Sequence, residues 1–99
     1  MVKIKREEAM KYLADVPEEY VFRCHDSCVF KNMRELRDGL ANMIDEVYAY
    51  HANAEKNDFS NWVRDIIKDE TLAAELQGLI SRGEATRRVG SRIARLSKK

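Results

Sequence analysis

Apolar residues recur at helical spacing through the second half of this chain, and this pattern constrains its fold more than any other feature. Five of them share one helical face after Asp58: Phe59, Trp62, Val63, Ile66 and Ile67. Two further stripes follow, one after Asp69 (Leu72, Ala73, Leu76 and Leu79 or Ile80) and one near the end (Ala85, Val89, Ile93 and Leu96). We therefore predict consecutive amphipathic helices, with a break at 81–83 and a last helix over 84–97.

The first half predicts shorter elements. A helix is expected over 5–14, with Met10 and Leu13 on one face, before Pro17. Aromatic and β-branched residues favour strands over 20–24 and 28–31, joined by a two-residue turn at Asp26 and Ser27. Asn32 is a candidate N-cap, with Glu35 three residues later, for a helix over 33–42. Residues 45–51 favour a helix, with a strand as the alternative.

These elements predict an α+β fold that is mainly α, a short β-hairpin followed by a compact bundle of four to five helices. The length of 99 residues is typical of one domain. We divide the single domain 1–99 into four segments: an N-terminal helix (5–16), the hairpin (20–31), a helical core (32–80) and a basic C-terminal helix (83–99).

Composition excludes several classes of protein. With 44% hydrophobic residues and a net charge of +1, the chain is neither a disordered polyelectrolyte nor a uniformly basic nucleic-acid binder. We find no apolar run of the roughly 18–20 residues that span a bilayer and no secretory signal, so we expect a cytoplasmic protein. Cys24 and Cys28 are too few for a disulfide framework, and the cytosol would keep them reduced.

Two segments, 22–36 and 45–65, carry a resemblance. The second contains His51-Ala52-Asn53, Asn57-Asp58-Phe59 and Trp62-Val63-Arg64-Asp65. Over about residues 20–76 the chain resembles a mostly archaeal family of small proteins that is catalogued only as a domain of unknown function. Ser27 stands where that family usually has a turn glycine, and Ala52 where it has valine. The resemblance implies the fold and the compartment, and it implies no reaction.

Cys24, His25 and Cys28 form the first candidate site, because thiols and an imidazole within five residues suit metal binding or redox chemistry. A structural zinc site needs four ligands and no second Cys/His pair exists, so we assign no metal and no cofactor. With a turn at Asp26 and Ser27, Cys24 would face Val29 and the two sulfurs would point to opposite sides. A redox-responsive thiol and ordinary packed cysteines remain alternatives.

His51 and Asp58, together with His25, form a second, polar candidate site. A carboxylate can orient a histidine that acts as a general base. However, no nucleophile has a motif context, and Asp58 suits the N-cap of the helix that starts at Phe59. We therefore assign no catalytic residue and expect His51 to bridge the loop to the core. Tyr50 lies off the Val47–Tyr48–His51 face and is the better candidate for an exposed contact, and we expect it to form a second contact surface together with the hairpin around His25.

The C-terminal segment holds the third candidate site. Residues 82–99 carry seven basic residues and one acid (+6), while residues 1–81 carry 11 basic and 16 acidic residues (−5). Arginines recur on one helical face, and the contact residues that we predict are Arg87, Arg88, Arg92, Arg95 and Lys99. Such a face can bind an acidic protein, a nucleic acid or an anionic membrane, or it can pair with the acidic body of its own domain.

The function best supported by the sequence is a non-catalytic interaction or regulatory module. It would dock on an acidic protein surface or a larger enzyme complex, with possible redox control through its cysteines. A nucleic-acid-binding accessory protein is the alternative. The sequence names neither the partner nor the oligomeric state.

Overall fold

Asn32 begins the helix that lies at the centre of the fold. The Asn32 side chain accepts a hydrogen bond from the Glu35 amide at 2.8 Å, which satisfies one of the open N–H groups of the first helical turn. The helix that follows, α2, spans Met33–Asn42 and buries Met33, Leu36 and Leu40. It packs most extensively against the last helix, α6, so the predicted capping residue fixes where the core begins.

The structure is a computed structural model that describes residues 5–25, 27–79 and 81–97. The described part is α+β and mainly α, as the sequence predicts. The remaining elements are α1 (Arg6–Leu13), a 3₁₀ turn η1 (Glu18–Tyr20), β1 (Phe22–Arg23), β2 (Val29–Phe30), α3 (Asp45–His51), α4 (Asp58–Trp62), a π-helical turn η2 (Val63–Ile67), α5 (Glu70–Leu76) and α6 (Arg82–Ser97).

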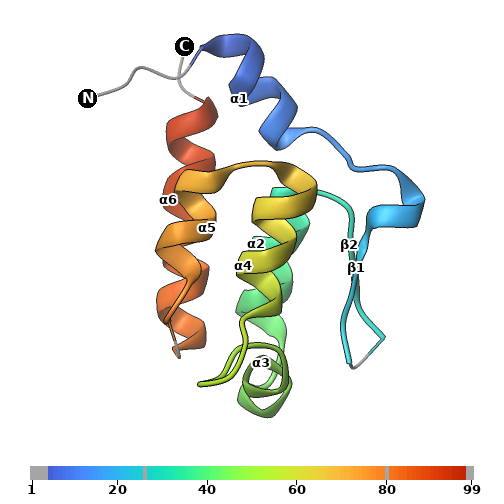
Figure 1. Ribbon diagram of the computed structural model, residues 1–99, viewed down its shortest axis with the longest axis vertical. Helices are drawn as coiled ribbons and strands as arrows, with labels where there is room; N and C mark the ends of the chain where they lie inside the picture. Colours follow the sequence, from blue (N-terminus) through green and yellow to red (C-terminus); the bar gives the residue numbers. More distant parts are fainter. Residues whose placement is uncertain (1–4, 26, 80, 98–99) are drawn as a thin grey trace.

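Figure 1 shows how these elements are arranged. Helices α5 and α6 lie side by side, α2 and α4 lie next to them, and the hairpin covers the far side. Helix α1 crosses one end of the bundle and α3 lies at the other end. Within the described residues, five α-helices follow the hairpin, and residues 45–51 form a helix rather than the alternative strand.

The hairpin differs from the predicted one in its register. Phe22 pairs with Phe30 and Arg23 pairs with Val29. The Cys24 amide then donates to Cys28 O at 2.7 Å, and the Ser27 amide donates to Cys24 O at 3.1 Å. These bonds close a three-residue loop over 25–27, in which Ser27 has the left-handed φ of 76° typical of a bulge position.

The predicted two-residue turn is therefore wrong, although Asp26 itself lies outside the described residues. Cys24 lies opposite Cys28 rather than opposite Val29. Tyr20 belongs to the 3₁₀ turn and not to the strand. Its carbonyl accepts a hydrogen bond from the buried Trp62 indole at 2.8 Å, which holds the chain before β1 against α4.

Other boundaries also differ from the sequence predictions. Asn57 caps α4, because its side chain accepts from the Ser60 amide at 2.9 Å, and Asp58 is the first helical residue. The last helix begins at Arg82, so the predicted break over 81–83 is misplaced, and Ile80 lies outside the described residues. Ala9 rather than Met10 packs into the core from α1.

Two helical glycines give opposite predictions for stability. A Cβ at Gly39 would overlap the buried Phe30 ring, whereas a Cβ at Gly90 would lie 3.6 Å from Arg37 Cδ, an ordinary contact. We expect Gly39→Ala to destabilise the fold by about 1–3 kcal/mol through overpacking, and Gly90→Ala to stabilise it by up to about 1 kcal/mol through helix propensity. Urea unfolding of both variants measures this, and the same sign for both would contradict the packing of β2 on α2.

Candidate functional site

His51 lies at the centre of the polar candidate site and is 5% exposed. Helix α3 places it in an aromatic cluster, where its ring lies edge-on to Phe22 and Phe59 at centroid distances of 5.2 and 5.4 Å. Its Nε2 accepts a hydrogen bond from the His25 amide at 3.0 Å. A backbone N–H can only donate, so a neutral ring carries its proton on Nδ1.

That proton is donated to Asp58, whose Oδ2 lies 3.0 Å from His51 Nδ1. The Lys56 ammonium approaches the same oxygen at 3.1 Å. Burial alone would raise the pKa of Asp58, but the hydrogen bonds from His51 and Lys56 outweigh it and hold the pKa below its ordinary value. The structure therefore brings together His51 and Asp58, whose proximity the sequence spacing left open, and Asp58 does not cap the helix.

This geometry determines what His51 can do chemically. One ring nitrogen accepts from His25 and the other donates to Asp58, so no nitrogen is left to take a proton from a substrate. The arrangement ties three segments together: the hairpin loop, α3 and the first turn of α4. In this conformation His51 is a structural bridge, and the loop that it joins to the core is the hairpin loop and not the expected polar loop over 53–57.

Outside this buried bridge lies an exposed group that we name the Tyr50 patch, composed of His25, Tyr50 and Lys56. Tyr50 is 50% exposed. The His25 ring stacks on it with a centroid distance of 4.1 Å and an interplanar angle of 20°, and Lys56 Nζ lies 4.9 Å from the centre of the Tyr50 ring. The sequence proposed Tyr50 and His25 as contacts but missed Lys56, since nothing in their spacing brings the three together.

The basic helix α6 differs from the predicted continuous basic surface. Arg92 is 8% exposed and forms a two-point ion pair with Asp69, which is 1% exposed. Arg92 Nε lies 2.7 Å from Asp69 Oδ2, and Arg92 Nη2 lies 2.9 Å from Asp69 Oδ1. This burial argues against the prediction that Arg92 is a partner contact, because its guanidinium is bound by Asp69 inside the fold. Lys99 lies outside the described residues.

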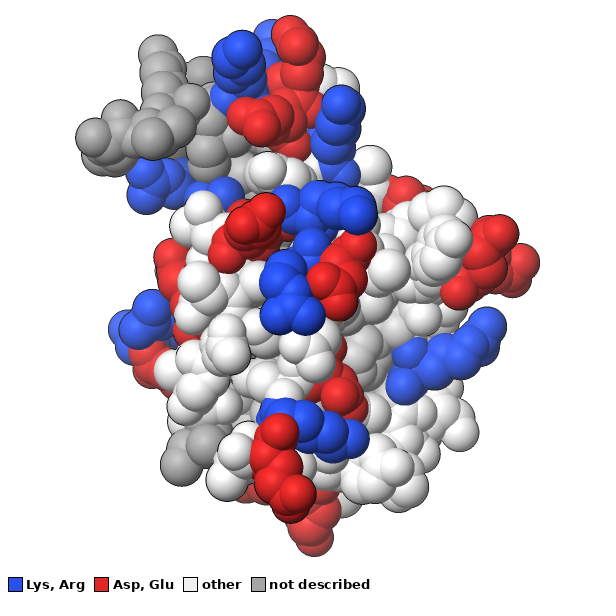
Figure 2. All heavy atoms as spheres, viewed as in Figure 1, with Lys and Arg blue, Asp and Glu red and all other residues white. Residues whose placement is uncertain are grey.

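Other arginines of α6 pair with acids of the same molecule. Arg82 Nε lies 2.8 Å from Asp45 Oδ1, and Arg88 contacts Glu84 and Glu75 at 3.4 and 3.9 Å. A hydrogen bond from Arg87 is the main cause that lowers the pKa of Glu84. On the face drawn in Figure 2, Lys and Arg side chains accordingly lie beside Asp and Glu side chains rather than forming one positive area.

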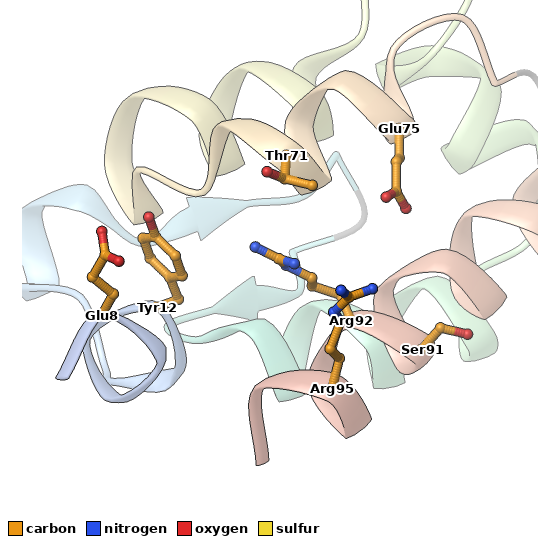
Figure 3. Close-up of a pocket in the computed structure, with 7 residues that line it drawn as sticks. All are labelled: Glu8, Tyr12, Thr71, Glu75, Ser91, Arg92 and Arg95. Carbon is orange, nitrogen blue, oxygen red and sulfur yellow. The ribbon is translucent and has the colours of Figure 1, made fainter. Parts of the chain in front are cut away.

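Arg95 is exposed and lines a groove of about 470 Å³ between α1, α5 and α6. Figure 3 shows Arg92 and Arg95 projecting from α6 toward this groove, with Glu8 and Tyr12 opposite them on α1. Thr71, Glu75 and Ser91 complete the lining. Carboxylates and guanidinium groups thus share the groove, which does not offer a purely cationic surface to a nucleic acid.

Comparison with known protein families, curated proteins and solved structures finds no match for this chain. The resemblance to a mostly archaeal family therefore stays a prediction from its motifs.

Over residues 5–25, 27–79 and 81–97, no three His, Cys, Asp or Glu side chains are grouped so as to hold a metal ion. No described helix has the length and apolar character needed to cross a membrane. Among the described residues, the Tyr50 patch is a place where exposed aromatic and charged side chains contact one another.

Proposed function

We propose that this chain is a cytoplasmic, non-catalytic interaction or regulatory module that docks on a larger protein through the Tyr50 patch. One observation carries the proposal: an aromatic ring that is half exposed is nevertheless in contact with both a second ring and a cation. Tyrosine is enriched among the residues that dominate binding energy at interfaces, since it offers a large contact area with few rotatable bonds.

The support beneath the patch favours this role. The His25 backbone is fixed by its hydrogen bond to His51, and Lys56 is held at Asp58. A contact residue that is ordered before binding loses little conformational entropy when the partner arrives, so more of the contact energy remains as affinity. The buried His51–Asp58 pair thus holds His25 and Lys56, two residues of the Tyr50 patch, in place.

The chemistry of the patch suggests the kind of partner. Lys56 and His25 both contact the ring of Tyr50. A surface that offers carboxylates around an apolar contact would complement both the cation and the ring. We therefore keep the acidic protein partner proposed from the sequence and move its contact from α6 to the hairpin end of the molecule.

Tyr50→Ala tests the proposal, with Tyr20→Ala as the matched control, because Tyr20 is another tyrosine with a largely exposed side chain. We expect Tyr50→Ala to reduce recovery of a specific partner from native cell extract by about tenfold or more, as removal of an interface hot spot does. Tyr20→Ala should leave recovery unchanged. Quantitative mass spectrometry of the captured proteins measures both.

Circular dichroism and thermal unfolding must first show that both variants fold. If folded Tyr50→Ala recovers the same partners in the same amounts as the wild type, the Tyr50 patch is not the docking surface. Equal losses in the two variants would also contradict the proposal, since they would reveal a general sensitivity of capture to surface apolar groups.

A further inference from the structure

The hairpin places the two cysteines opposite each other. The pairing of Phe22 with Phe30 and of Arg23 with Val29 continues to Cys24 and Cys28, whose backbones are joined by a hydrogen bond of 2.7 Å from the Cys24 amide to Cys28 O. Hydrogen-bonded partners on antiparallel strands have Cα atoms about 5.5 Å apart. That separation falls within the roughly 4.4–6.8 Å found across disulfides.

The two side chains also lie on the same face of the hairpin. Side chains alternate between the faces of a strand, so Cys24 follows the face of Phe22 and Cys28 that of Phe30. The Phe22 and Phe30 rings stack with centroids 5.6 Å apart, which fixes that common face. The three-residue loop is what makes this possible, because a two-residue turn would have set the two thiols on opposite faces.

The two thiols differ in accessibility. Cys24 is 7% exposed and belongs to the buried core, whereas Cys28 is exposed at the end of the hairpin. The structure shows no disulfide between them. An oxidant in solution therefore meets Cys28 first, and Cys24 is placed beside it to complete an exchange.

We propose that Cys24 and Cys28 form a thiol–disulfide exchange site whose co-reactant is a small-molecule disulfide of the glutathione type. The Cys28 thiolate attacks one sulfur of that disulfide, a mixed disulfide forms on Cys28, and one thiol leaves. The Cys24 thiolate then attacks the Cys28 sulfur, the intrachain bond forms, and the second thiol leaves. Two cysteine thiols are oxidised, one external disulfide is reduced to two thiols, and the two protons pass to those thiols.

Closure of this bond alters the support of the Tyr50 patch. The covalent ring of residues 24–28 contains His25, whose amide bonds His51 and whose ring stacks on Tyr50. Formation of the disulfide therefore restricts the backbone of His25, the residue that joins the hairpin to the Tyr50 patch. This regulatory consequence rests on the proposed function, whereas the exchange site itself does not.

The test uses the full chain equilibrated with mixtures of oxidised and reduced glutathione, followed by acid quenching, alkylation and intact mass measurement. We expect the wild type to lose two hydrogen atoms without gaining glutathione, with both cysteines protected from alkylation. The matched control carries Cys28→Ser with Val29→Cys. This control keeps two cysteines but places the second one opposite Arg23, on the other face of the hairpin. We therefore expect it to accumulate mixed disulfides with glutathione. Its intrachain disulfide should need a ratio of oxidised to reduced glutathione about tenfold higher than that of the wild type.

Three outcomes would overturn the exchange site: a glutathione adduct as the stable wild-type product, dimers linked between chains, or closure of the control as readily as the wild type. Amide spectra of the reduced and oxidised chain give the separate readout for the patch, where we expect the His25 and Tyr50 signals to shift together. If the Cys24–Cys28 disulfide forms while the amide signals of His25 and Tyr50 stay unchanged, the exchange site is supported and its link to the Tyr50 patch is refuted.

Discussion

Arg92→Ala is expected to lower the free energy of unfolding by about 3–5 kcal/mol, because it leaves the buried Asp69 carboxylate without its cation. Asp69 is almost fully buried, and both of its oxygens bond Arg92. For a domain of this size the loss corresponds to a fall in Tm of more than about 12 °C. Urea unfolding followed by circular dichroism measures it.

Arg87→Ala is the matched control, since Arg87 lies on the same helix and also pairs with an acid, Glu84, but is 71% exposed at its side chain. Exposed pairs contribute little, so we expect a change within about 1 kcal/mol. Asp69→Asn in an Arg92→Met background tests the cause, because the amide can still cap α5 at Leu72 without a buried charge. The double variant should be more stable than Arg92→Met alone. Equal stability would show that packing and not charge dominates.

The burial of Arg92 could have been predicted from the sequence, whereas the identity of its partner could not. The prediction grouped Arg88, Arg92 and Arg95 as one face, but Arg92 also lies three residues after Val89 and four before Leu96. That spacing belongs to the apolar stripe, and all three residues are buried. A charged residue within an apolar stripe requires a buried counter-charge. Which acidic residue supplies that counter-charge depends on how α5 packs against α6, and no local sequence pattern gives this packing.

The same contacts explain the uneven charge of the chain. The acidic body and the basic C-terminal segment, −5 and +6 by sequence, meet within one molecule. Arg82, Arg88 and Arg92 of α6 pair with Asp45, Glu75 and Asp69, which lie on α3 and on or beside α5. These three ion pairs stabilise the packing of α6 on its own domain, and this is why we do not place the docking surface there.

Most helices and the position of the hairpin could be predicted, but the register of the hairpin could not, for a physical reason. The predicted helix over 33–42 has the observed bounds, because its capping residue and apolar spacing are local signals. The hairpin register depends on whether Ser27 takes a positive φ, which serine accepts only when the surrounding contacts require it. The bond from His25 to His51, 26 residues away, supplies such a contact. One residue in the loop then decides on which face each cysteine lies.

His51→Ala is the second variant for which we expect a large effect, about 3 kcal/mol or more. It removes a buried ring from the aromatic cluster and leaves the His25 amide without its acceptor. Two further variants separate the hydrogen bonds. His51→Gln can keep an acceptor toward His25, and His51→Asn can keep a donor toward Asp58. The free energy of unfolding of both variants should lie between that of His51→Ala and that of the wild type. If one of them is as unstable as His51→Ala, the hydrogen bond that this variant lacks contributes more to stability.

Asp58 gives this bridge a dependence on pH whose sign follows from its lowered pKa. Because the pKa of Asp58 is lower in the folded protein than in the unfolded chain, its contribution to stability is full above the unfolded value of about 4 and is lost as the pH falls through the folded value. We therefore expect wild type and Asp58→Asn to differ most near neutral pH and to converge toward pH 3, as measured by urea unfolding across that range. His51 and Lys56 are the two groups that hold the carboxylate. A difference that stays constant down to acid pH would mean that the amide disrupts packing, and that the charge of Asp58 does not stabilise the bridge.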